Sequence, residues 1–86
     1  MAARTVKVGS TIGLHARPAR IIAEAAQGFE HAVVLTHNNQ SVLAESPLLI
    51  MSLGAEHGAE VTVASKDDHA ADHIAQLLER DLDAEA

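Results

Sequence analysis

The sequence predicts a small α+β protein in which a four-stranded antiparallel sheet is covered on one side by helices. Two long segments place apolar residues at helical spacing, and a Ser-Pro pair introduces a shorter helix. Four short segments alternate apolar with polar residues, as strands do. These segments follow one another as strand, helix, strand, strand, helix, strand and helix, an order typical of helices packed on one side of an antiparallel sheet.

The first strand and the first helix are expected at residues 5–8 and 16–27. Val6 and Val8 alternate with polar residues, so they share one face of the strand. In the helix, apolar residues recur at i, i+3, i+4 and i+7, and most of them are small, which favours close packing on a sheet. Gly28 follows as a C-terminal stop.

The middle of the chain is expected to form a hairpin with strands at 32–37 and 40–44. Asn38 and Asn39 lie between the strands, and asparagine tolerates the positive φ of a tight turn better than most residues. Both strands contain apolar residues at alternate positions, so one side of the hairpin should be buried.

The last part of the chain is expected to hold a short helix, a strand and a longer helix. Ser46 is a preferred N-cap and is followed by proline, which places the short helix at 47–53. Valines alternate with polar residues in a strand at 60–65. Two aspartates then introduce the last helix, which runs to about residue 82.

Length and composition limit what the chain can do. Its 86 residues suffice for one domain, expected at 1–86, with a single modest core. Twelve acidic and six basic residues give a net charge of −6, which argues against nucleic acid as the main partner. There is no cysteine, and no apolar run approaches the roughly 20 residues of a membrane span. We expect a cytoplasmic monomer that needs no cofactor or metal and does not insert into membranes.

The stretch Gly-Leu-His-Ala-Arg-Pro-Ala at 13–19 contains the candidate chemistry. Gly13 permits an unusual turn before the helix, and Pro18 is tolerated in the first helical turn. The imidazole of His15 is therefore expected beside a helix N-terminus, where backbone N–H groups and the Arg17 guanidinium favour an anion. Histidine is mostly uncharged at pH 7 and can act as a nucleophile. A phosphoryl group bound to His15 itself is the anion that fits best.

These seven residues closely resemble the active-site signature of HPr, the histidine phosphocarrier family of the phosphoenolpyruvate:sugar phosphotransferase system. The resemblance continues, with little change of spacing, through Ser46, Met-Ser-Leu-Gly at 51–54 and Gly-Ala-Glu at 58–60. It implies a βαββαβα open-faced sandwich, with a four-stranded antiparallel sheet and three helices on one face. It also implies that the first and last strands are adjacent and that the hairpin is partly separated from them.

The same resemblance implies a phosphocarrier rather than an enzyme. It implies that Nδ1 of His15, the pros nitrogen, accepts a phosphoryl group from phosphorylated enzyme I and passes it to the sugar-specific EIIA components. Ala16 and Arg17 would bind the phosphoryl oxygens. Each transfer is stoichiometric, so the chain is a substrate of its partners, and regulatory proteins are further candidates among them.

Partner docking is expected beside this site and on the short helix. Arg20 adds positive charge one turn from Arg17, where the family usually has a small residue, and favours acidic partners. The short helix is too apolar to be buried completely, and we assign Ile50 and Leu53 to the core. The residues that remain for docking are Pro47, Leu48 and Met51.

Ser46 has two interpretations. In many members of the HPr family the matching serine is phosphorylated by a regulatory kinase, which makes Ser46 a candidate phosphoserine. Here Glu45 would repel the added phosphate, and Pro47 changes the backbone that such a kinase would recognise. The role of Ser46 as a helix cap is sufficient to explain a serine at this position.

Other functions are compatible with parts of the sequence. A paralogue would serve a regulatory phosphotransferase chain or a dihydroxyacetone-type kinase system. A pure interaction module would not need both His15 and Arg17. A small metal-binding protein would use His69 and His73, which lie four residues apart on the last helix, but the sequence indicates no third ligand.

Overall fold

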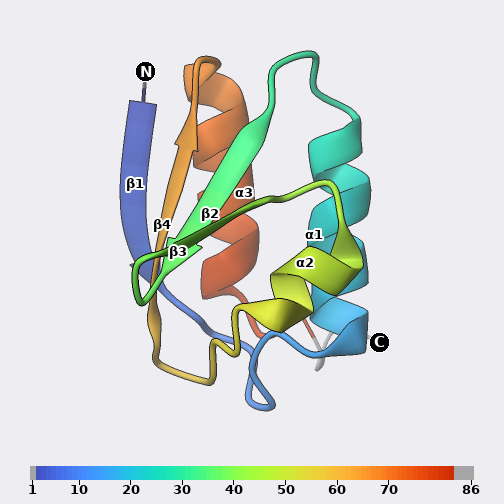
Figure 1. The fold of residues 1–86 in the computed structure, drawn as a ribbon, viewed down its shortest axis with the longest axis vertical. Coiled ribbons are helices and arrows are strands. Elements are labelled where there is room, and N and C mark those ends of the chain that lie inside the picture. The colour runs from blue at the N-terminus through green and yellow to red at the C-terminus, as the bar shows by residue number, and fades with distance from the viewer. Residues whose placement is uncertain (1, 83–86) are drawn as a thin grey trace.

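The computed structural model describes residues 2–82 and shows one sheet with helices packed against one of its faces (Figure 1). The order of the elements is the predicted one, and the α+β fold class is confirmed. Within the described residues no helix is long and apolar enough to cross a membrane. Along the chain the elements are β1 (Ala2–Lys7), α1 (Ala16–Gln27), β2 (Val33–His37), β3 (Gln40–Leu43), α2 (Pro47–Ser52), β4 (Glu60–Ser65) and α3 (Asp68–Glu79).

The four strands form one antiparallel sheet in the order β1-β4-β2-β3. The predicted adjacency of the first and last strands is confirmed, because β1 pairs with β4 from Ala2↔Ser65 to Lys7↔Glu60. The hairpin is not separated from them, since β2 pairs directly with β4 from Val33↔Ser65 to Thr36↔Thr62. This pairing brings the apolar residues of β2 and β4 onto the same buried face.

The core lies between the sheet and the helices. The inward side chains of β2 and β4, Val33, Leu35, Val61 and Val63, are at most 1% exposed, as their alternation predicted. The predicted stripe of α1 is also confirmed, and its small residues let this helix approach the other layers closely. The buried residues of that stripe are Ala19, Ile22, Ala23 and Ala26.

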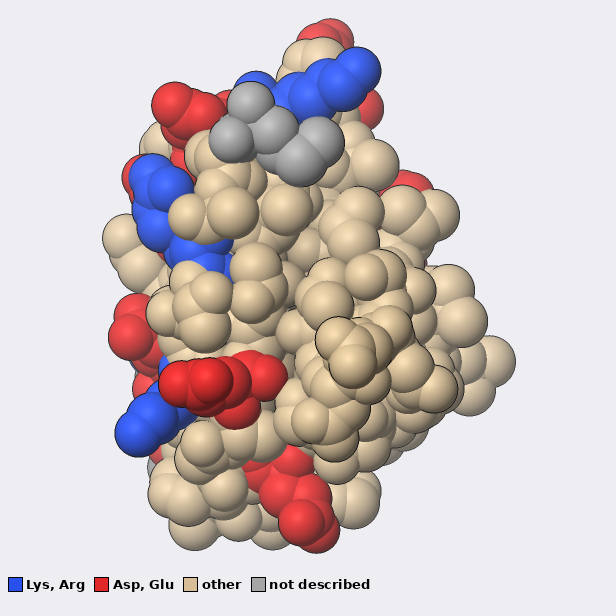
Figure 2. Space-filling view, turned by 60° about the vertical axis from the view of Figure 1, so that its left-hand side comes forward, with Lys and Arg blue, Asp and Glu red and all other residues tan. Residues whose placement is uncertain are grey.

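The opposite face of the sheet carries a row of uncharged hydroxyl groups across all four strands. The register aligns Thr5, Thr62, Thr36 and Ser41 in one row across the four strands. The hydroxyl oxygens of Thr5 and Thr62 are 2.9 Å apart, and those of Thr36 and Ser41 are 2.7 Å apart. Figure 2, turned toward β1, shows basic and acidic groups together along one edge and a broad uncharged area beside them. These hydroxyl groups can remain hydrated without a covering helix.

Local signals in the sequence predicted the turns and helix starts well. Asn38 and Asn39 have φ values of 50° and 65°, so both adopt the left-handed conformation of a tight hairpin turn. Asp67 caps α3, because its Oδ1 accepts hydrogen bonds from the N–H groups of His69 at 2.9 Å and Ala70 at 3.3 Å. Each of these features depends on residues close together in the chain.

Two element boundaries differ from the predictions by about three residues, and four others differ by a single residue. β1 begins at Ala2 rather than at residue 5, because the added residues continue the ladder with β4. α3 ends at Glu79 rather than near residue 82, because Arg80 has an extended backbone with φ −86° and ψ 152°. Leu82 nevertheless lies in the core, at 2% exposure.

Ser46 caps α2, and its replacement tests how much that cap contributes. Its Oγ accepts a hydrogen bond from the N–H of Leu49 at 3.3 Å. We expect Ser46→Ala to lower the free energy of unfolding by about 1 kcal/mol, the usual contribution of such a cap. Urea unfolding followed by circular dichroism measures the change. Ser46→Asp is the control, because aspartate also caps helices, and wild-type stability of the alanine variant would contradict this role.

Candidate functional site

His15 stands at the N-cap position of α1 and is exposed. Its backbone is extended, with φ −85° and ψ −167°, and its carbonyl oxygen accepts a hydrogen bond from the N–H of Ala19 at 2.9 Å. The backbone therefore starts the helix, whereas the side chain makes no capping hydrogen bond. The imidazole lies beside a helix N-terminus, as predicted, and it is not needed to cap the helix.

The first turn of α1 offers backbone donors to an anion at this position. The N–H groups of Ala16 and Arg17 have no acceptor within the helix, because the first helical residues lack a preceding turn. Pro18 is buried and has no N–H. It therefore adds no unsatisfied backbone donor to the first turn of the helix. The positive end of the helix dipole adds to the effect of these donors.

The loop before His15 is fixed by its contacts with residues 55 and 56. Leu14 is 4% exposed, and its N–H donates to the carbonyl oxygen of Ala55 at 3.0 Å. Gly13 has φ +79°, and a Cβ atom on it would lie 2.8 Å from the same oxygen and 3.0 Å from the Cα of Glu56. Only glycine satisfies both the positive φ and the close approach, which explains the glycine two residues before the histidine.

The same loop contacts the end of α3. The N–H of Gly9 donates to the carbonyl oxygen of Leu78 at 2.8 Å, and Oγ1 of Thr11 donates to Oδ2 of Asp81 at 2.7 Å. A Cβ atom on Gly9 would lie 1.9 Å from the carbonyl oxygen of Glu79. The chain that leads to His15 is therefore positioned by the last helix.

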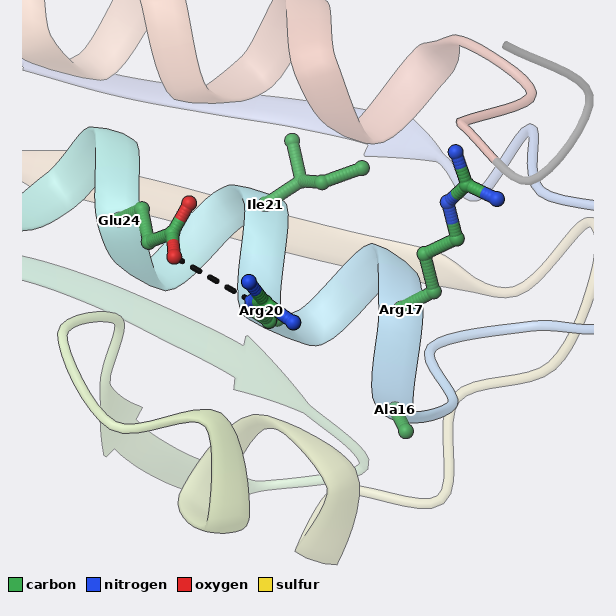
Figure 3. Close-up of a pocket in the computed structure, with 5 residues that line it drawn as sticks. All are labelled: Ala16, Arg17, Arg20, Ile21 and Glu24. Atoms are coloured by element: carbon green, nitrogen blue, oxygen red, sulfur yellow. Dashed lines mark hydrogen bonds and ion pairs between the residues drawn. The ribbon is translucent and has the colours of Figure 1, made fainter. Parts of the chain in front are cut away.

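The exposed side of α1 forms an open groove next to His15 (Figure 3). Its volume is 580 Å³, and it opens widely to solvent, which suits a protein surface better than an enclosed small molecule. Nε of Arg20 lies 3.3 Å from Oε2 of Glu24, one turn further along the helix. The residues that line the groove are Ala16, Arg17, Arg20, Ile21 and Glu24.

The short helix α2 packs against α1 and is amphipathic despite its apolar composition (Figure 1). Ile50 is fully buried, and Leu53, just after the helix, is 5% exposed, so both core assignments are confirmed. Leu48 is 76% exposed, whereas Pro47 and Met51 are half-buried, and Met51 packs against the core. These last three residues remain docking candidates, with Leu48 the most accessible.

A family model described as "PTS HPr component phosphorylation site" matches residues 2–80. The chain belongs to the HPr family. Members of the HPr family are phosphocarriers of the phosphotransferase system and not catalytic enzymes, so the coarse function is that of a phosphocarrier. The resemblance seen in the sequence is therefore confirmed.

Solved structures of HPr proteins are similar to the whole fold. The phosphocarrier protein HPr from Bacillus anthracis str. Ames is 26% identical with a TM-score of 0.85, covering 90% of this chain and 95% of that one. HPr from Thermoanaerobacter tengcongensis is 32% identical with a TM-score of 0.84, covering 92% of each chain. The catabolite repression protein Crh of Bacillus subtilis is 29% identical with a TM-score of 0.74, covering 95% of this chain and 98% of that one. The HPr-like βαββαβα sandwich is thus confirmed.

Several residues of this HPr site were not identified from the sequence. Gly9 and Thr11 contact residues about seventy positions later, and no local pattern predicts such contacts. Ile12 and Leu49 are 48% and 42% exposed, and an apolar residue in a loop or a short helix gives no signal of its exposure. His57 holds the same loop, because its Nδ1–H can donate to the carbonyl oxygen of Ser10 at 3.3 Å.

The two histidines considered for metal binding contact an aromatic ring. The ring centroids of His69 and His73 lie 6.2 and 5.9 Å from that of Phe29. Between residues 2 and 82 there is no group of three or more side chains that could hold a metal ion. The spacing of four residues between His69 and His73 places both imidazoles on one face of α3, where they pack against Phe29.

Proposed function

We propose that this chain accepts a phosphoryl group on Nδ1 of His15 from phosphorylated enzyme I and passes it to sugar-specific EIIA components. The observation that supports this most directly is the position of His15, which is exposed at the N-cap of α1 and makes no capping hydrogen bond through its side chain. Its ring is therefore accessible to two different partner proteins in turn. A carrier supplied from phosphoenolpyruvate acts in the cytoplasm.

The proposed transfer is a displacement at phosphorus. In the neutral imidazole with its proton on Nε2, the lone pair of Nδ1 attacks phosphorus, and the N–P bond forms as the bond to the donor breaks. The N–H groups of Ala16 and Arg17 and the Arg17 guanidinium stabilise the charge on the phosphoryl oxygens. In the second transfer a nucleophile of EIIA attacks the same phosphorus and the N–P bond breaks.

Intact-mass spectrometry tests the proposal directly. The chain is incubated with phosphoenolpyruvate and the enzyme I of the same organism, and we expect it to gain one phosphate that is lost in acid. Addition of an EIIA component should then remove that phosphate at neutral pH. No gain of mass with an enzyme I that phosphorylates another HPr would overturn the proposal.

Arg17 is expected to accelerate transfer without being needed for folding. It lies in the first turn of α1 and lines the groove beside His15. A charged hydrogen bond to the transferring group contributes about 1.5–3 kcal/mol, so Arg17→Ala should slow phosphorylation about 10- to 100-fold. Rapid-quench measurement of phosphohistidine formation gives the rate.

A control variant separates the loss of the Arg17 side chain beside His15 from a general loss of positive charge. Arg4 lies on β1 and pairs with Asp72 of α3, with 2.7 Å between Nε and Oδ1. Arg4→Gln removes the same charge away from the groove and should leave the transfer rate within about 2-fold of wild type. Equal rates for Arg17→Ala and wild type would exclude the proposed role.

The partner surface and the assembly state are part of the same proposal. Arg20 on α1, together with Pro47, Leu48 and Met51 at α2, is proposed to contact enzyme I and EIIA, because exposed apolar and cationic groups lie on adjacent helices there. We propose that the carrier acts as a monomer, although its relative Crh is an intertwined dimer. Regulatory phosphorylation of Ser46 remains a prediction from the family.

A further inference from the structure

The groove on α1 contains charges of both signs in a fixed order. Arg17 and Arg20 lie toward the His15 end, and Glu24 lies one turn further away. Figure 3 shows Glu24 directed back along the helix to Arg20, while the Arg17 side chain extends from the other end of the groove. The contact is 3.3 Å from Nε of Arg20 to Oε2 of Glu24, so this carboxylate is the counter-ion of Arg20.

Helix stability does not explain this ion pair. The two side chains are 75% and 63% exposed, and exposed pairs of this kind add little to stability. The orientation is also the less favourable one, because an acidic residue is better placed N-terminal to its basic partner on a helix. The pair therefore matters for the charge that the groove presents to a partner.

We propose that Glu24 is a specificity-determining residue of this phosphocarrier surface, and that it acts by neutralising Arg20 and thereby weakening the attraction of acidic partners. The inference rests on the proposed function, in which Arg20 faces the docking partner. A partner carboxylate must compete with Glu24 for the Arg20 guanidinium. The groove therefore discriminates against partners that depend on a contact with Arg20.

This role gives the groove a defined electrostatic preference. Acidic groups of a partner are attracted less strongly around Arg20, because Glu24 already contacts its guanidinium. Salt screens exposed charges over roughly 10 Å at 0.1 M, so the discrimination should decrease as ionic strength rises. Docking strength, and not the chemical step at His15, is the quantity that Glu24 changes.

Steady-state kinetics with this chain as the substrate of enzyme I provide the test. With phosphoenolpyruvate in excess, we expect Glu24→Gln to lower the KM for the chain about 3-fold in 50 mM NaCl, with kcat unchanged. Arg20→Gln should raise KM by a similar factor. In the Arg20→Gln background, Glu24→Gln should change KM by less than about 1.5-fold, because the guanidinium that Glu24 neutralises is absent. In 300 mM NaCl the difference between wild type and Glu24→Gln should become small.

A control variant and the contradicting outcomes complete the design. Glu30 is exposed and lies beyond the C-terminal end of α1, so Glu30→Gln makes the same change in net charge away from the groove and should leave KM unchanged. If Glu24→Gln lowers KM equally with and without Arg20, or raises it, the proposal is overturned. If wild type accepts no phosphate at all, the proposed function fails instead, so the two failures are distinguishable.

Discussion

Replacing His15 with alanine is expected to abolish acid-labile phosphorylation of the chain by enzyme I and phosphoenolpyruvate. His15 is the N-cap of α1, beside the backbone donors of Ala16 and Arg17, and no other imidazole has that position. The Nδ1 atoms of His37 and His57 are engaged with the carbonyl oxygens of Glu60 and Ser10. Those two rings cannot offer the same nitrogen to a donor, so loss of phosphate should be complete.

The alanine variant should fold normally, which makes the experiment decisive. The His15 side chain is exposed and makes no capping hydrogen bond, so the free energy of unfolding should change by less than about 1 kcal/mol. Circular dichroism and urea unfolding check this. His73→Ala is the matched control and should still gain one phosphate. Phosphate retained on the folded His15→Ala variant would refute the assignment of the site.

Gly9→Ala is expected to cause the largest loss of stability among the substitutions considered. Its Cβ atom would lie 1.9 Å from the carbonyl oxygen of Glu79 and 2.5 Å from the attached carbon, both of which are backbone atoms. The loop and the end of α3 must separate, which also breaks the 2.8 Å hydrogen bond from Gly9 to Leu78. Overpacking of this kind and a lost hydrogen bond together should lower the free energy of unfolding by about 3 kcal/mol.

Another glycine provides the control for this prediction. Gly28 ends α1 with φ −78°, and its Cβ would be 3.4 Å from the nearest atom, the carbonyl oxygen of Ala25. Gly28→Ala should therefore leave the free energy of unfolding unchanged or raise it by up to about 1 kcal/mol. Thermal or urea unfolding compares both variants with wild type. Similar stabilities of Gly9→Ala and Gly28→Ala would show that the close approach at Gly9 can relax without cost.

The sequence predicted those parts of the fold that depend on neighbouring residues. Ser46 and Asp67 are helix caps because a short polar side chain reaches N–H groups two or three residues later. Asn38 and Asn39 make the hairpin turn for an equally local reason. The direct pairing of β2 with β4 was not predicted, because register between distant strands is set by the shared core and not by either segment alone.

The candidate site also combines local features, which the sequence predicted, with contacts between distant residues, which it did not. The position of His15 at the start of α1 could be predicted from seven consecutive residues. The hydrogen bond from Thr11 to Asp81 could not be predicted, because the two residues are 70 positions apart. Arg20 and Glu24 are four residues apart, so helical spacing brings them together. Their place in the groove depends on the folded surface and could not be predicted from that spacing.

The contacts between the loop at Gly9 and the end of α3 also bear on biosynthesis. During translation His15 is made more than 60 residues before Leu78 and Asp81, which position its loop. A nascent chain that lacks α3 contains His15 but lacks the contacts that hold Gly9 and Thr11 in the preceding loop. The loop that leads to His15 can therefore be fixed in its folded position only after the ribosome has added α3 and Asp81.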